Sequence, residues 1–166
     1  MTYVFVTIWI AIVLFMAGES GRTFWRSRSK PPRWTWWMFF TGWMVAVVHT
    51  VLAFAVAHDW SHADAVRSTA RLTRDMYGLE FDAALYMNYV FLAVWLADAC
   101  WWAAAPPGYV RPAIATWTLR AFYIIYLFNA MVVFAHGWRR ILGLLFVSWL
   151  ARIWSPGVLQ SRPRRA

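Results

Sequence analysis

Long apolar runs separated by short charged segments constrain what this chain can fold into. A helix needs about 20 apolar residues to cross the hydrocarbon of a bilayer, and several such runs are typical of membrane-spanning helices. The chain is 62% apolar and only 14% charged, whereas soluble domains carry about 25% charged residues. The sequence therefore predicts an integral membrane protein with an all-α fold.

The apolar runs predict several membrane helices within a single membrane domain, residues 1–166. The last run, ILGLLFVSWLARIW, would cover only about 21 Å at the helical rise of about 1.5 Å per residue. It must therefore cross with little tilt, rely on arginines that reach the headgroups, or lie in the interface. We expect a bundle of about five transmembrane helices, or four plus one interfacial helix. The predicted ranges are about 3–18, 34–57, 83–105, 114–136 and 140–154.

The distribution of lysine and arginine predicts how the chain is oriented. The connection RTFWRSRSKPPRW carries five basic residues, whereas the 58–82 connection balances three arginines with acidic residues. Basic connections stay on the cytoplasmic side of a membrane. We therefore expect a multi-pass protein of the bacterial cytoplasmic (inner) membrane, with the N-terminus outside. The 19–33 loop and the C-terminal tail SRPRRA are expected in the cytoplasm.

The formal net charge of +9 bears on the choice of partner. The sixteen Lys and Arg residues stand in short clusters between apolar runs, where they orient helices and meet anionic headgroups. We therefore expect the lipid bilayer, and no nucleic acid, as partner. Cys100 is the one cysteine of the chain, so the sequence contains neither a disulfide framework nor a CxxC metal site.

Three of the four histidines are candidate ligands of a metal ion or a haem. His58 and His62 form an HxxxH pair, which on a continuing helix would direct both rings to one side, and His136 is expected at the same outer rim. The alternative is that these residues are polar caps of helix ends at the headgroup level. We favour this alternative and expect no cofactor, while metal or haem binding by His58, His62 and His136 remains a second hypothesis.

Several uncharged polar residues fall within the apolar runs. His49 lies on a stripe of small side chains that lets another helix approach, and Tyr126 and Asn129 share a face of the fourth predicted helix. The helical rise places Asn88 at a similar depth. Because polar faces in lipid seek each other, we predict an intramembrane polar pocket of His49, Asn88, Tyr126 and Asn129.

Asp98 and Arg120 are ionisable residues within predicted membrane helices. Each lies about 10 Å from the cytoplasmic end of its helix. An unpaired carboxylate or guanidinium at this depth is costly. We therefore predict a buried ion pair between Asp98 and Arg120.

The segment DWSHADAVRSTARLTRDMYG predicts an amphipathic helix on the outer surface, over residues 59–77. Asp59 or Ser61 would cap its start, and Gly78 would end it. Its arginines fall on one face and could hold an anionic headgroup or an acidic partner, although a solvated face balanced by aspartates is the favoured interpretation. This outer basic face consists of Arg67, Arg71 and Arg74.

The blocks HDWSHADAVRSTARLTRDMYG, LYMNYVF and WLADACWW resemble an uncharacterised group of small multi-span bacterial membrane proteins. The resemblance implies no activity, cofactor or fold, and it assigns no role to any residue. The sequence contains no Walker loop, GxSxG, HExxH or CxxCH motif.

These features favour a non-enzymatic role. The leading hypothesis is a tryptophan-rich integral membrane subunit, or an assembly or scaffold protein, of a larger membrane complex. It would dock through its lipid-facing sides onto a membrane protein partner, or onto further copies of itself as a homo-oligomer. The first alternative is a small redox protein that binds metal or haem through the outer-rim histidines. The second alternative is a small-solute transporter or channel lined by the intramembrane polar residues.

Overall fold

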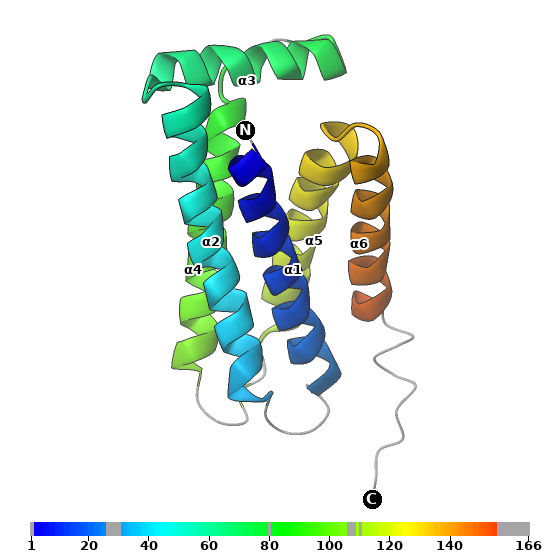
Figure 1. Ribbon diagram of the computed structural model, residues 1–166. Coiled ribbons are helices and arrows are strands. Elements are labelled where there is room, and N and C mark those ends of the chain that lie inside the picture. Colours follow the sequence, from blue (N-terminus) through cyan, green and yellow to red (C-terminus); the bar gives the residue numbers. More distant parts are fainter. Residues whose placement is uncertain (1, 26–30, 80, 106–108, 110, 156–166) are drawn as a thin grey trace, which may run out of the picture. The chain divides into compact units, whose positions relative to one another are not determined.

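The computed structural model describes residues 2–25, 31–79, 81–105, 109 and 111–155, and its regular elements are all helices (Figure 1). The predicted all-α fold is thus confirmed. The helices are α1 (Thr2–Trp25), α2 (Arg33–Ala57), α3 (His62–Tyr77), α4 (Ala84–Ala104), α5 (Ala113–Phe128), the π-helical turn η1 (Asn129–Val133) and α6 (Trp138–Trp154).

Four helical segments in the described part of the chain are long and apolar enough to cross a membrane: Tyr3–Trp25, Arg33–Ala57, Ala84–Ala104 and Ala113–Val133. They correspond to the first four predicted spans, so the chain is a helical membrane bundle. α6 contains 17 residues, fewer than the roughly 20 that a bilayer requires. Whether α6 crosses the membrane as a fifth span or lies in the interface beside four spans therefore remains a prediction.

α1 is longer than the sequence predicts. The expected end near residue 18 is wrong, because the helix continues to Trp25. Glu19 and Thr23 in this extension are buried, so packing outweighs the weak helix preference of the glycine and serine residues around them. The predicted 19–33 loop consequently begins as a helix.

The chain forms two compact units. The first unit comprises Met1–Glu19 and Arg33–Ala105, and it contains most of α1 together with α2, α3 and α4. The second unit comprises Ser20–Pro32 and Pro106–Ala166, and it contains the last turns of α1 together with α5, η1 and α6. Each unit is described separately below.

Aromatic rings fill the core of the first unit. The ring of Trp95 on α4 lies 5.0 Å from that of Phe15 on α1 and 5.6 Å from that of Phe39 on α2. Gly42 permits this approach, because a Cβ atom there would lie 3.0 Å from the Trp95 ring and 3.1 Å from the carbonyl oxygen of Ala11. The absence of a side chain at Gly42 therefore brings three helices together.

α3 lies across the ends of α2 and α4 and packs against α4 (Figure 1). The Ser61 hydroxyl accepts a hydrogen bond from the Asp64 N–H at 3.2 Å, which caps the first turn. Gly78 ends the helix with φ = 71°, and its N–H donates to the Arg74 carbonyl at 2.7 Å. Of the two residues predicted as caps, Asp59 and Ser61, Ser61 is the one that caps the helix, and Gly78 ends it as predicted.

The second unit is built around a hairpin of α5 and α6, which are joined by the turn that follows η1 (Figure 1). Gly143 on α6 lies so close to the backbone of η1 that an added Cβ atom would collide with the Met131 carbonyl. The last turns of α1 contribute a further contact, because the Trp149 indole N–H donates to the Ser20 hydroxyl at 3.0 Å.

Candidate functional site

The predicted HxxxH pair lies at the junction of α2 and α3, at the end of the first unit. α2 ends at Ala57, and Asp59 and Trp60 adopt φ values of 45° and 62°. Such left-handed conformations are uncommon for residues other than glycine. His58 and His62 therefore do not lie on one continuing helix, which was the assumption behind their predicted common direction. The outer helix was expected to start at residue 59. α3 starts at His62 instead, because the left-handed conformations of Asp59 and Trp60 interrupt the helix.

His58 forms a close polar contact with the first turn of α3. Its Nδ1 atom lies 2.9 Å from the Asp64 carboxylate. The Arg67 guanidinium lies 3.9 Å from the other carboxylate oxygen. The hydrogen bond with His58, followed by the positive charges of His58, Arg67 and Arg71, lowers the pKa of Asp64. Because Nδ1 faces the carboxylate, the Nε2 atom of His58 is left for other interactions.

The His62 ring packs in a cluster of aromatic side chains. Its centroid lies 6.1 Å from that of Phe54 on α2, and 5.8 Å and 6.3 Å from those of Tyr86 and Tyr89 on α4. The His58 ring also contacts Phe54, at 6.1 Å. His62 therefore connects the start of α3 to the ends of α2 and α4, and His58 connects the end of α2 to α3.

Metal binding by the three predicted histidines remains a hypothesis. Among the described residues, no group of three or more His, Cys, Asp or Glu side chains could hold a metal ion. His58 and His62 belong to the first unit, whereas His136 is an exposed residue of the second unit. Cys100 is exposed as well.

His49 finds its partner on α1, an element that the sequence analysis did not consider. The His49 Nδ1 atom lies 2.8 Å from the Val4 carbonyl oxygen and 3.3 Å from the Thr7 hydroxyl. Because a carbonyl oxygen only accepts, Nδ1 must carry the proton in the bond to Val4. The half-buried imidazole thus links α2 to α1 across the first unit.

The other members of the predicted polar pocket are divided between the units. Asn88 is half-buried on α4 in the first unit, whereas Tyr126 and Asn129 belong to the second unit. The Asn129 amide donates to the Ile125 carbonyl of its own helix at 2.8 Å. A common pocket of His49, Asn88, Tyr126 and Asn129 therefore stays a prediction.

Arg120 is buried within the second unit and lies against two indole rings. Its guanidinium carbon is 5.2 Å from the Trp117 ring centroid and 5.4 Å from that of Trp154. Cation–π contacts of this kind partly compensate for the loss of water around a buried cation. Asp98 is equally buried, but it lies in the first unit, so the predicted Asp98–Arg120 ion pair stays a prediction.

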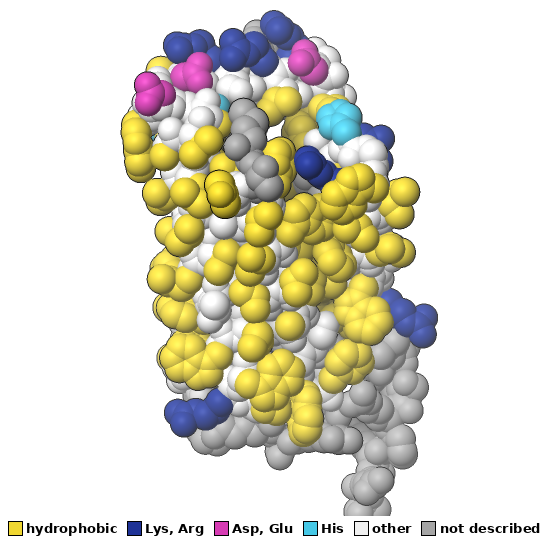
Figure 2. Space-filling view, in the orientation of Figure 1, with side chains coloured by type: hydrophobic (Ala, Val, Ile, Leu, Met, Phe, Trp, Pro, Cys, Tyr) yellow, Lys and Arg dark blue, Asp and Glu magenta, His cyan; other side chains and the backbone are white. Residues whose placement is uncertain are grey.

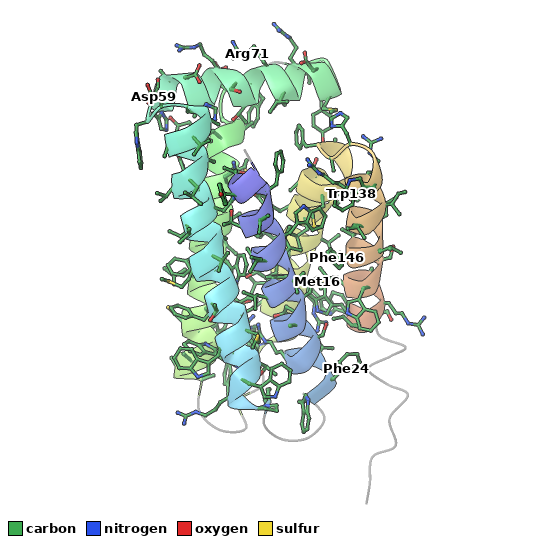
Figure 3. The ribbon with its side chains drawn as sticks, in the orientation of Figure 1. Met16, Phe24, Asp59, Arg71, Trp138 and Phe146 are labelled. Carbon is green, nitrogen blue, oxygen red and sulfur yellow. The ribbon has the colours of Figure 1, made fainter. Side chains whose placement is uncertain are left out.

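The arginines of α3 are exposed on the side opposite to its buried residues. Ala65 and Thr73 are buried, whereas the labelled Arg71 points away from α2 and α4 (Figure 3). Arginine and aspartate side chains gather over α3 in the space-filling view (Figure 2). Arg74 lies 4.0 Å from Asp75, so acidic neighbours offset part of the positive charge. The predicted basic face of Arg67, Arg71 and Arg74 is exposed in this mixed-charge setting.

Arg140 is a residue whose role the sequence analysis missed. Its Nε atom donates to the carbonyls of Val132 at 2.9 Å and Ala135 at 3.1 Å, and its terminal nitrogen donates to Val133 at 3.3 Å. A helix leaves its last carbonyl groups without partners, so Arg140 satisfies the end of η1. The sequence shows only two arginines in the turn GWRR, and nothing in it indicates which one folds back.

Comparison of this chain with models of protein families, with curated proteins and with solved structures finds no match. The geometry of the described residues is therefore the basis of the functional argument that follows.

Proposed function

We propose that this chain is a non-catalytic integral membrane subunit, or an assembly or scaffold protein, of a larger complex in a bacterial cytoplasmic membrane. Its N-terminus would lie outside, and the 19–33 segment and the C-terminal tail would lie in the cytoplasm, as the distribution of basic residues favours. The sides of its membrane helices would dock onto a protein partner or a further copy of the chain.

One observation carries this proposal. Polar side chains within the spans form hydrogen bonds with main-chain carbonyl groups of the same unit. His49 pairs with Val4, and the indoles of Trp36 and Trp43 on α2 donate to the Ala99 and Leu92 carbonyls on α4 at 2.9 Å and 3.0 Å. Such bonds fasten helix to helix, which is the role expected of a structural subunit.

The surface of α2 supports a docking role. Only 17% of its most apolar stretch is buried within the chain. Its exposed apolar side chains include Trp37, Met44, Val48 and Val51, and apolar side chains cover much of the surface in Figure 2. Lipid or a second protein must cover this face, because a surface of this kind is not stable in water.

Isolation from native membrane in mild detergent, followed by mass spectrometry of co-eluting proteins, tests the proposal. The expected result is a complex larger than the monomer. The variant Val48→Trp adds bulk that fluid lipid tolerates but a packed interface does not, so it should release the partner. Ile125→Trp, at an exposed position of α5, is the matched control. A wild-type protein that remains a monomer without a partner would contradict the proposal.

A second candidate function is metal or haem binding at the outer rim. The observation that favours it is the His58–Asp64 contact at 2.9 Å, because metal-binding histidines commonly have one ring nitrogen oriented by a carboxylate. Elemental analysis and an optical spectrum of the purified protein test this candidate, with His58→Ala as the control. Absence of both bound metal and a Soret band would exclude it.

A further inference from the structure

The last turn of the α5 segment is wound more widely than an α-helix. In η1 the Phe134 N–H donates to the Asn129 carbonyl, five residues earlier, at 3.0 Å. A π turn accommodates one residue more than an α turn, and such turns are frequently found at functional sites. Met131 and Val132 are buried in this turn.

Two features of α6 hold η1 in this form. The Arg140 side chain donates to three carbonyl groups at its end, those of Val132, Val133 and Ala135. The missing side chain of Gly143 makes room for the Met131 carbonyl. Arg140 is itself exposed, so the guanidinium that closes the turn is accessible from outside.

We propose that η1 is a two-position joint between α5 and α6, and that Arg140 locks it in the π form. Without the lock, the turn rewinds as an α-helix. Each residue of an α-helix turns the chain by about 100°, so rewinding removes Met131 and Val132 from their present positions against α6. α6 then reorients relative to α5, together with its exposed residues Ile141, Leu145 and Trp149. This inference concerns the hairpin alone and does not depend on the proposed function.

Hydrogen–deuterium exchange of the detergent-purified, full-length protein measures how strongly Arg140 stabilises the hydrogen bonds of η1. Arg140→Gln should accelerate exchange of the amides in residues 130–135 by about tenfold or more, because the unlocked turn breaks its hydrogen bonds each time it changes between the π and α windings, while residues 116–127 keep the wild-type rate. Arg139→Gln is the matched control. It removes the same charge from the same turn, but the Arg139 guanidinium lies over the Trp138 ring, 5.9 Å from its centroid.

A deletion variant distinguishes the two-position joint from the alternative that Arg140 is an ordinary helix cap. Removal of Ala130, an exposed residue of η1, takes away the extra residue and should allow continuous α-helical winding into the turn. In this background Arg140→Gln should no longer change the exchange rate. Deletion of Ala121, an exposed residue within regular α5, is the control and should disrupt packing of the hairpin.

Three results would overturn the proposal. Arg140→Gln could leave exchange in η1 unchanged, or it could accelerate exchange equally along all of α5, which would indicate unfolding of the hairpin. It could also have the same effect with and without Ala130, in which case Arg140 is a helix cap and η1 is not a joint.

Discussion

α3 in the first unit and α6 in the second each begin shortly after a membrane helix has ended, yet their first turns are held differently. α3 is held by side chains: Ser61 caps its first turn, His58 contacts Asp64, and His62 packs on aromatic rings. α6 begins at Trp138, its N-cap residue Gly137 provides no side-chain hydrogen bond, and its Arg140 binds backbone carbonyls.

This difference shows two ways of ending a membrane helix near the bilayer surface. In the first unit, polar and aromatic side chains of neighbouring helices meet, so the junction contains groups that titrate. In the second unit, Gly143 packs closely against the η1 backbone, and the guanidinium of Arg140, which does not titrate, binds main-chain carbonyl groups of the turn. The two junctions should therefore respond to different perturbations.

The largest effect is expected for two buried ionisable residues, one in each unit. Asp98 is 2% exposed in the first unit and Arg120 is 8% exposed in the second. Asp98→Arg or Arg120→Asp should each lower stability by about 3–5 kcal/mol, because a buried charge loses its compensation. The yield of folded protein and thermal unfolding in detergent measure this loss.

Reversing both charges together should restore the yield if Asp98 and Arg120 pair. Asp75→Arg, at an exposed position of α3, is the control and should change little. A double variant as poor as either single variant would show that the two residues do not pair.

The next largest effect is expected at Gly143. Gly143→Ala should destabilise the protein by about 3 kcal/mol, because overpacking forces a shift of the backbone rather than of a flexible side chain. Ser148→Ala, on the exposed side of the same helix, should be close to neutral. Thermal unfolding of both variants tests the claim that the backbone closes this hairpin, and equal melting temperatures would contradict it.

The residues that precede α3 and α6 should differ in sensitivity. Ser61→Ala removes a hydrogen bond and should cost about 1 kcal/mol. Gly137 has φ = 61° and ψ = −141°, a conformation that other residues avoid, so Gly137→Ala should cost about 1–3 kcal/mol through strain. Equilibrium unfolding in denaturant compares the two variants. If Ser61→Ala proves the more harmful, the contrast between the two junctions is wrong.

The smallest effect is expected from pH at the α2–α3 junction. Because contact with His58 lowers the pKa of Asp64, the ionised carboxylate stabilises the folded junction. This stabilisation is present above the unfolded-state pKa of about 3.9 and is lost as pH falls through the lower folded-state value. The protection of the amides in the first turn of α3, which is the intrinsic exchange rate at each pH divided by the observed rate, should therefore fall in acid for the wild-type protein.

Asp64→Asn provides the control for this pH effect. The variant should already exchange faster at about pH 6, and the difference from wild type should be smaller near pH 3, below the unfolded-state pKa of about 3.9, where the stabilisation by the ionised carboxylate is being lost. The hairpin of the second unit should show no comparable change. A wild-type–variant difference that is the same at both pH values would contradict a role for Asp64 ionisation.

The sequence allowed prediction of those features that depend on neighbouring residues. Gly78 was correctly expected as the stop of α3, and Ser61 was one of the two expected caps, since capping acts within one helical turn. The end of α1 was placed too early, because charge and glycine near residue 19 suggested a break. Burial of Glu19 and Thr23 shows that packing carries the helix further.

Pairings between distant residues could not be predicted in the same way. The depth estimate for His49 suggested amide partners on other helices, whereas the structure gives it the Val4 carbonyl on α1. Likewise, the HxxxH spacing assumed a straight helix that Asp59 and Trp60 interrupt. Helical rise gives depth, but the choice of partner also depends on how each helix is rotated and which neighbour faces it.

From the amino-acid sequence it was possible to predict an all-helical membrane protein, the approximate positions of its four long apolar helices, and the glycine that ends α3. These properties follow from hydropathy summed along the chain and from local capping, both of which act within a single segment. Only the tertiary structure decided that His49 contacts α1, that Arg120 lies between two indoles, and that Arg140 and Gly143 hold a π turn. Those contacts depend on close packing between segments distant in sequence, where a shift of one ångström changes which atoms meet.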